Sequence, residues 1–129
     1  MTSRLCEIVV DCADAELVGR FWSDVLGWPL VSDPEGYCWL SATGAPDALP
    51  LLVFVGVPEP KSVKNRVHLD IRAEGSGEPD ELAQLQAAEL DRLVALGARR
   101  IDVGQGEVPW VVLADPEGNE FCLLGPRLN

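Results

Sequence analysis

The sequence runs twice through one order of elements: a strand, a helix and three short strands. Matching helix ends align the two halves at Val25-Leu26-Gly27 and Ala95-Leu96-Gly97, because a glycine readily takes the left-handed conformation that closes a helix. A half of about 60 residues buries too little surface to be stable by itself, so the two halves are expected to pair their sheets. The 129 residues are therefore predicted to form one α+β domain of two βαβββ modules, module one at 1–62 and module two at 63–129.

Hydrophobic periodicity and turn residues place the elements of each module. In module one, alternation over 5–12 predicts a strand, and helical spacing after Asp14 predicts a helix that ends at Gly27. Three short strands are expected to follow, near 29–32, 37–42 and 50–57. Module two is predicted to have a strand at 66–72, a helix from about residue 80 to Leu96, and strands at 99–103, 109–114 and 119–124. The tetrad Asp-Pro-Glu-Gly occurs at 33–36 and 115–118, at different places in the two modules, and is interpreted each time as a local turn.

Both opening strands carry polar residues on one face. Alternation puts Glu7 and Asp11 on one side of the first strand, and His68 and Asp70 on one side of the strand at 66–72. If the two sheets pair, these polar faces would point into a shared hollow. His68 is the only histidine of the chain, and it is either a pocket residue with an acid–base role or a hydrogen-bonded structural residue.

The charge of the chain narrows the expected partners. Ten Lys and Arg residues stand against 21 Asp and Glu residues, which gives a net charge of −11. The negative electrostatic potential of such a chain repels phosphate backbones and anionic lipids, so neither nucleic acid nor a membrane is expected as a partner. The charge favours a cationic ligand, or it only keeps the protein in solution. No apolar run approaches the roughly 20 residues that span a bilayer, and Glu7 interrupts any signal-peptide region, so a cytoplasmic location is predicted.

Several classes of site are absent from the sequence. The four cysteines lie in apolar stretches and form no C-x-x-C pair, so free, buried thiols are expected rather than a zinc ribbon or a thioredoxin-like site. No phosphate-cradling glycine loop and no Ser/His/Asp order occurs, which argues against nucleotide use and covalent catalysis.

The ordered motifs resemble the vicinal oxygen chelate superfamily, which includes glyoxalase I, extradiol dioxygenases and bleomycin-resistance proteins. The resemblance covers nearly the whole chain and is greatest to small glyoxalase-like members. It rests on Ile8-Val9-Val10-Asp11, Phe21-Trp22 through Gly27, Val67-His68-Leu69-Asp70, Leu93 through Ala98, and the closing run from Val112 to Phe121, which is the most specific. The resemblance implies an eight-stranded, cup-shaped sheet that holds one divalent metal ion in the active members.

The resemblance also implies where metal ligands would lie, on the first and last strands of each module. The first-strand positions are Glu7, where His or Gln is usual, and His68. The last strand of module one, near 50–57, has no acid; in module two the position coincides with Cys122, while Glu120 lies two residues earlier on the same face. The implied ligand set is thus incomplete, and Glu7, His68 and Glu120 remain as candidate ligands.

Three hypotheses of function follow. In the first, the protein is an enzyme of the lyase or isomerase type, or a metal-assisted one, that acts on a small carbonyl or hydroxylated metabolite. His68 and Glu7 are its catalytic candidates, and Asp70 would orient His68 or share its proton. In the second, the protein sequesters an aromatic or cationic compound without catalysis, as the antibiotic-resistance relatives do. In the third, it is a degenerate member with only a structural or dimer-forming role.

Ligand-binding candidates come from both modules. They are Asp11, Trp39, Asp70, Trp110 and Cys122. Trp39 and Trp110 lie on strands that flank the presumed hollow, and an aromatic ligand would stack on such side chains. The resemblance and the apolar strand edges further predict a homodimer, which a sedimentation measurement at micromolar concentration would test.

Overall fold

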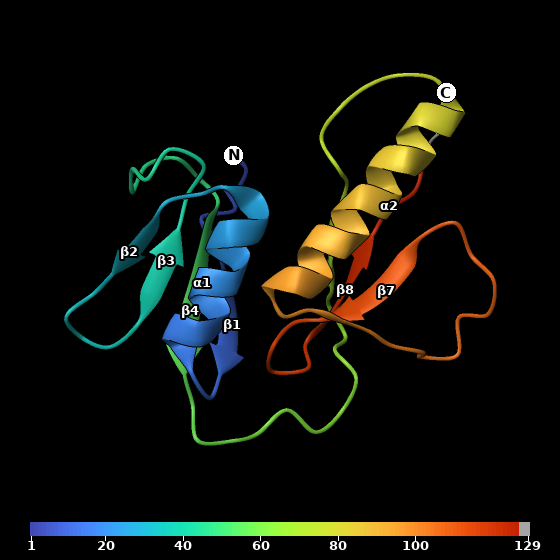
Figure 1. Cartoon of the computed structure of the whole chain (residues 1–129). Helices are drawn as coiled ribbons and strands as arrows, with labels where there is room; N and C mark the ends of the chain where they lie inside the picture. Colours follow the sequence, from blue (N-terminus) through green and yellow to red (C-terminus); the bar gives the residue numbers. More distant parts are fainter. Residues whose placement is uncertain (127–129) are drawn as a thin grey trace. The chain divides into compact units, whose positions relative to one another are not determined.

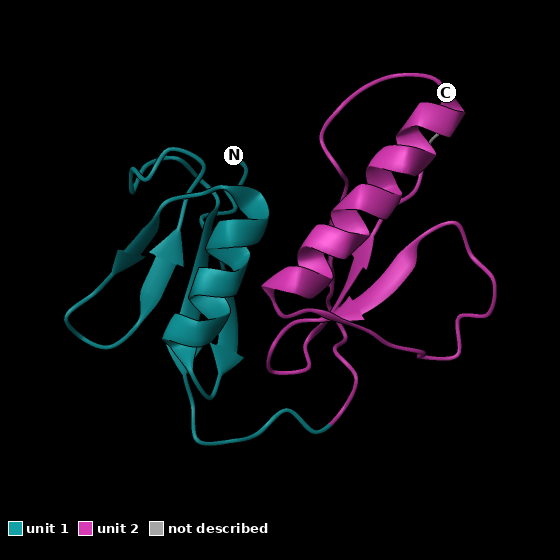
Figure 2. Ribbon diagram, in the orientation of Figure 1, with its two compact units in different colours: residues 1–62 teal, residues 63–129 magenta. Residues whose placement is uncertain are grey.

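The computed structural model of the protein describes residues 1–126. The chain divides into two compact units, unit 1 at 1–62 and unit 2 from residue 63 onward (Figure 2). Each unit has one helix and a four-stranded mixed sheet (Figure 1). That the two units form a single domain stays a prediction.

Unit 1 follows the order β1 (Glu7–Cys12), α1 (Ala15–Leu26), β2 (Leu30–Ser32), β3 (Cys38–Leu40) and β4 (Leu51–Gly56). Its strands lie in the order β1-β4-β3-β2, with β1 parallel to β4 and the other neighbours antiparallel. The first strand therefore pairs with the last, and Val10 lies beside Phe54 in their register.

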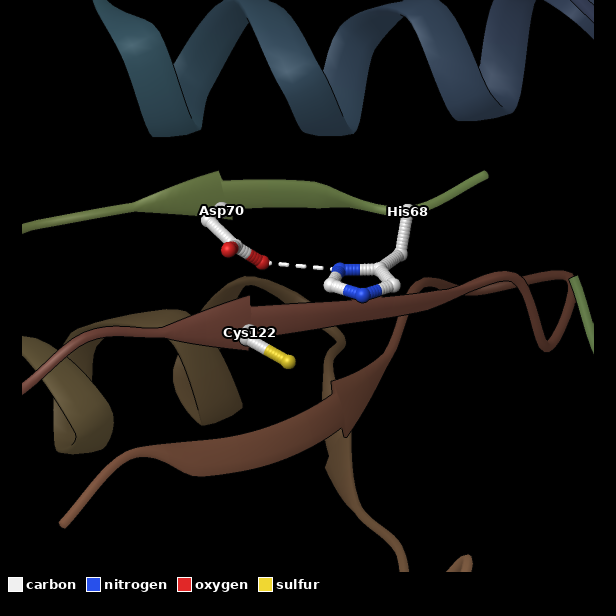
Figure 3. Close-up of side chains that lie close together, drawn as sticks. All are labelled: His68, Asp70 and Cys122. Carbon is white, nitrogen blue, oxygen red and sulfur yellow. Dashed lines mark hydrogen bonds and ion pairs between the residues drawn. The ribbon is translucent and has the colours of Figure 1, made fainter. Parts of the chain in front are cut away.

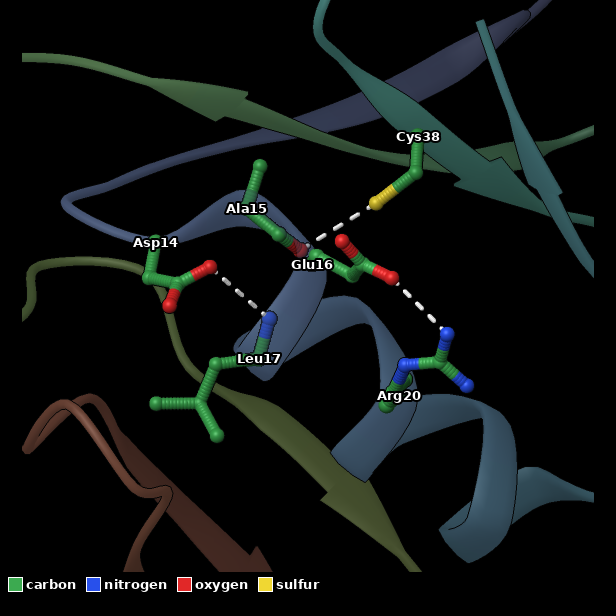
Figure 4. Close-up of polar contacts among 6 residues, drawn as sticks. All are labelled: Asp14, Ala15, Glu16, Leu17, Arg20 and Cys38. Carbon is green, nitrogen blue, oxygen red and sulfur yellow. Dashed lines mark hydrogen bonds and ion pairs between the residues drawn. The ribbon is translucent and has the colours of Figure 1, made fainter.

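Local signals at both ends define α1, and Figure 4 shows those of its first turn. The Asp14 carboxylate accepts a hydrogen bond from the Leu17 backbone N–H at 3.1 Å, which satisfies one of the free donors of the first turn. Gly27 closes the helix with φ 68°, a conformation that favours glycine. On the exposed side, Arg20 pairs with Glu16 at 2.8 Å, one turn apart. The predicted helix bounds match the observed ones.

The apolar side of α1 packs on one face of the sheet. Gly19 permits a close approach, because a Cβ there would lie 2.6 Å from the Cys38 Sγ and 3.5 Å from the Phe54 ring. Cys38 and Phe54 therefore point toward the helix, and strand alternation turns Trp39 to the other face. Because Val10 shares the face of Phe54, the neighbouring Glu7 and Asp11 side chains also lie on the face away from α1. The fully or nearly fully buried residues of this core include Val18, Phe21, Trp22, Leu40 and Leu52.

Unit 2 repeats this arrangement with β5 (Leu69–Ile71), α2 (Pro79–Leu96), β6 (Arg99–Arg100), β7 (Val111–Ala114) and β8 (Glu120–Leu123). The strand order β5-β8-β7-β6 matches β1-β4-β3-β2, and β5 is parallel to β8. The predicted α+β class and the repeated βαβββ order are confirmed. Within the described residues, neither helix has the length and apolar character needed to cross a membrane.

Several predicted strands are shorter in the structure. The strand expected at 66–72 is only Leu69–Ile71, so His68 lies just before it. The strand expected at 99–103 ends at Arg100, because the Asp102 carboxylate accepts a hydrogen bond from the Gly104 N–H at 2.7 Å and turns the chain. Trp110 likewise precedes β7 rather than lying on it. All four cysteines are free, but the prediction that all are buried is wrong for Cys6, which precedes β1 and is exposed.

The two Asp-Pro-Glu-Gly tetrads, at 33–36 and 115–118, form the same turn. In each, the glycine N–H donates to the aspartate carbonyl, at 3.0 Å and 2.9 Å, and the glutamate N–H donates to the aspartate carboxylate, at 2.8 Å and 2.9 Å. The first turn joins β2 to β3, whereas the second joins β7 to β8. They are thus local turns at different places in the two modules, as predicted.

Candidate functional site

A hollow of about 510 Å³ opens on unit 2, and we call it the unit 2 groove. On β8, Glu120 and Cys122 line it, while Phe121 and Leu123 are buried, as the alternation of a strand requires. All residues that line the groove belong to unit 2. Five of the predicted site residues lie here: His68, Asp70, Trp110, Glu120 and Cys122.

His68 and Asp70 form a hydrogen-bonded pair in this groove. The His68 Nδ1 lies 2.8 Å from an Asp70 carboxylate oxygen, and the two side chains are 43% and 41% exposed. When the imidazole is neutral, its Nδ1–H donates to the carboxylate and leaves Nε2 with a free lone pair. Figure 3 shows this second nitrogen turned away from Asp70, toward the side on which Cys122 lies. The pair can therefore present a proton acceptor to a molecule in the groove.

Cys122 lies beside Asp70, because β5 and β8 are parallel neighbours in which these two residues are paired. One ligand atom from each of His68, Asp70 and Cys122 lies within 4.8 Å of the other two. Burial raises the pKa of the Cys122 thiol, and the charge of Asp70 and a hydrogen bond to it raise this pKa further. By itself the side chain is therefore a protonated thiol rather than a nucleophile.

Glu120 lines the groove but is separate from this cluster. Its carboxylate accepts a hydrogen bond from the Asn65 backbone N–H at 2.9 Å. The carboxylates of Asp70 and Glu120 are matched by two cations that line the same groove, Lys64 and Arg72. With His68 neutral the groove has no net charge, so the −11 of the chain is not concentrated there.

The apolar part of the groove includes Trp110, Val112 and Pro109. Trp110 is 39% exposed, so part of its ring is open to a partner. A planar ligand could stack on this surface while its polar groups reach His68.

The other predicted site residues, Glu7, Asp11 and Trp39, belong to unit 1. They lie on the sheet face away from α1, with Glu7 and Asp11 exposed and Trp39 half-buried. None of them lines the unit 2 groove. That they share a site with His68 stays a prediction.

Among the groove residues that were not predicted, two are charged, Arg72 and Lys64. Arg72 shares the alternation of His68 and Asp70, so its place on the polar face was visible in the sequence, but the pattern did not mark it as a binding residue. Lys64 lies in the segment before β5, where no strand or helix period indicates which way a side chain points.

The metal site implied by the family resemblance can be compared with the residues present. Strand β4 has the sequence LLVFVG and contributes no acid. A thiol occupies position 122, and the Glu120 carboxylate is held by Asn65. These residues do not fit a set made only of imidazole and carboxylate ligands. The donors that do come together are His68, Asp70 and Cys122.

Comparison with known proteins agrees with the fold. The family described as "Glyoxalase-like domain" matches residues 7–124. A comparison with curated proteins gives no significant match.

Several solved structures resemble this chain throughout. A glyoxalase/bleomycin resistance/dioxygenase family enzyme from Burkholderia phytofirmans has a TM-score of 0.67 at 17% identity, covering 94% of this chain and 97% of its own. The fosfomycin resistance protein FosX from Listeria monocytogenes has a TM-score of 0.65 at 15% identity, covering 99% and 94%. A glyoxalase-related enzyme from Fulvimarina pelagi has a TM-score of 0.61 at 20% identity, covering 95% and 87%. At these identities the likeness shows the fold.

Proposed function

Because the chain belongs to the glyoxalase-like domain family of the vicinal oxygen chelate superfamily, we propose that it binds a small carbonyl or hydroxylated metabolite and catalyses proton transfer on it. The site is the unit 2 groove, and the observation that carries the proposal is the His68–Asp70 pair at 2.8 Å. The reaction would be of the isomerase or lyase type. It would need no nucleophile from the protein, consistent with the raised pKa of the Cys122 thiol.

The proton would move through His68. Its Nε2 takes a proton from the carbon beside the substrate carbonyl and becomes an imidazolium, which the Asp70 carboxylate stabilises through Nδ1–H. The electron pair left on the substrate moves onto the carbonyl oxygen. Lys64 and Arg72 line the same groove and would stabilise that negative charge. The imidazolium then returns the proton to the substrate at the same or a neighbouring atom.

The test uses the exchange of substrate hydrogen with deuterated solvent. Wild-type protein is incubated with a panel of α-hydroxyketones, with and without aromatic rings, and proton NMR follows the signal of the carbon-bound hydrogen. We expect exchange with at least one of them, a loss of about 10²-fold or more in His68→Gln, and a smaller loss in Asp70→Asn. Glu16→Gln is the control, since this exposed carboxylate pairs with Arg20 on α1 and does not line the groove, so the change should leave the rate nearly unchanged.

Two results would count against proton transfer at His68: no exchange with any compound that binds, or exchange that persists unchanged in His68→Gln. Because His68 is the only histidine, its imidazole NMR signals report binding separately from turnover. The variant Glu7→Gln tests the shared site, because it should reduce exchange only if Glu7 takes part.

The exposed part of Trp110 favours a second candidate, the sequestration of an aromatic compound without turnover. In that case aromatic members of the panel would shift the His68 signals and quench tryptophan fluorescence, but no substrate hydrogen would exchange. Trp110→Ala should then weaken binding about fivefold or more, since stacking on a ring contributes about 1 kcal/mol.

A further inference from the structure

We propose that His68, Asp70 and Cys122 form a binding site for a thiophilic divalent metal ion, of which Zn²⁺ is the natural test. The three side chains supply an imidazole nitrogen, a carboxylate oxygen and a sulfur, with ligand atoms within 4.8 Å of one another. The inference does not depend on the proton transfer proposed above, because it concerns what this donor set can bind.

The sheet brings the donors together. Asp70 and Cys122 are paired across the parallel strands β5 and β8, and His68 lies two residues before Asp70 on the same polar side. Figure 3 shows all three side chains directed into one space beside these strands. In a tetrahedral zinc site with bonds of about 2.0–2.3 Å, neighbouring ligand atoms lie roughly 3.5 Å apart. Donors within 4.8 Å reach that spacing by small side-chain rotations.

The donor atoms of this site determine which metal ions it should prefer. Imidazole and thiolate suit zinc and its chemical neighbours, whereas Mn²⁺ and Mg²⁺ prefer oxygen ligands. The sulfur of Cys122 stands where the family resemblance implies a glutamate, and β4 adds no acid. The site should therefore select Zn²⁺ over Mn²⁺.

Access and proton balance are compatible with binding. His68 and Asp70 are each about two-fifths exposed, so an ion can enter from the groove, and three protein ligands leave one position of a tetrahedron for water. The Cys122 thiol gives up its proton to solvent as the metal–sulfur bond forms. A metal held by His68 would also occupy a nitrogen that the proposed proton transfer needs, so Zn²⁺ would inhibit exchange.

The experiment measures metal binding directly on the full chain. Protein freed of metal with a chelator is dialysed against ZnCl₂ or MnCl₂ and analysed for bound metal, and Co²⁺ serves as an optical probe. We expect one zinc per chain, no competition by equimolar Mn²⁺, and a near-ultraviolet thiolate-to-cobalt band in wild type. Cys122→Ser should lose this band, and Cys6→Ser is the matched control that should retain it, because Cys6 is exposed.

Variants at the exposed ligands test the site independently, because a change at the buried Cys122 could abolish binding by misfolding the protein. His68→Ala and Asp70→Asn change exposed side chains and should each weaken zinc binding at least tenfold while the circular dichroism spectrum is kept. The proposal is wrong if wild-type protein takes up no zinc, if the cobalt band survives in Cys122→Ser, or if His68→Ala binds zinc as tightly as wild type.

Discussion

Cys38 is held as a neutral thiol by its position under α1. It is 3% exposed, and its Sγ donates a weak hydrogen bond to the Ala15 carbonyl at 3.1 Å (Figure 4). Burial raises the pKa of this thiol, the charge of Glu16 raises it further, and Arg20 acts in the opposite direction. Because the thiolate is the reactive form, Cys38 should be inert while unit 1 is folded.

Iodoacetamide at pH 8 should therefore alkylate Cys6 and Cys38 of the native protein at different rates. Cys6, which is exposed, should react at least about tenfold faster than Cys38, which reacts only after local opening. Peptide mass spectrometry gives both rates in one sample. The pKa of Cys38 is higher in the folded protein than in the unfolded chain. The thiol therefore contributes fully to the stability of the folded protein below the pKa of the unfolded thiol, and this contribution is lost as pH rises through the pKa of the folded protein. Labelling of Cys38 should accordingly increase in alkaline solution; equal rates at pH 8 would contradict this account.

Single residues of the candidate site were predictable to different degrees. The alternation of residues 66–72 placed His68 and Asp70 on one face, which was enough to expect an interaction between them. The alternation within β5 does not predict that Cys122 lies beside Asp70, because that contact depends on how β5 pairs with β8. Only the family resemblance marked Cys122, and no signal marked Lys64.

At the scale of elements, the two Asp-Pro-Glu-Gly turns share their backbone bonds but differ in surroundings. Asp115 is 1% exposed, and the Asn119 side-chain amide also donates to its two carboxylate oxygens, at 3.3 Å and 3.1 Å. Asp33 is only half-buried, and the residue after its turn is Tyr37, whose hydroxyl hydrogen-bonds to the Asp33 side chain where Asn119 supplies an amide to Asp115. The carboxylate of the second turn is thus the more important one, since buried donors that lose a charged acceptor are costly.

We therefore expect Asp115→Ala to lower the free energy of unfolding by about 2 kcal/mol or more, and Asp33→Ala by about 1 kcal/mol or less. Urea unfolding followed by circular dichroism measures both. Each variant is the control of the other, because the turn type is the same. Equal losses would mean that burial and the Asn119 amide add nothing to the second turn.

The ends of helices were the most predictable elements, and the ends of strands the least. Asp14, Gly27 and Gly97 act through contacts within a few residues, so the sequence nearby is sufficient to locate them. Strand length depends instead on a partner far along the chain, such as β4 for β1. For this reason the strand order β1-β4-β3-β2 and the short β5 could not be read from periodicity.

At the scale of the whole molecule, the folding of the two units as one domain stays a prediction. The expectation of one domain comes from size, because a half-chain with one helix on a four-stranded sheet buries a limited apolar area. The shared site for Glu7 and His68 depends on the same pairing of sheets and stays a prediction with it. The homodimer, which is expected from the family resemblance and the apolar strand edges, also stays a prediction. The tryptophans offer a direct probe, since three of the four lie in unit 1 and only Trp110 lies in unit 2.

In Trp110→Phe, tryptophan fluorescence reports unit 1 alone, while the helical circular dichroism signal comes mainly from the 18 residues of α2 against 12 in α1. If the units form one cooperative domain, both signals should change at the same urea concentration. Trp110 is partly exposed, so the substitution should cost little stability, and wild-type dichroism provides the reference. Two separate midpoints would show that each unit unfolds by itself, and a site built from residues of both units would then need another source of cohesion, such as a second chain.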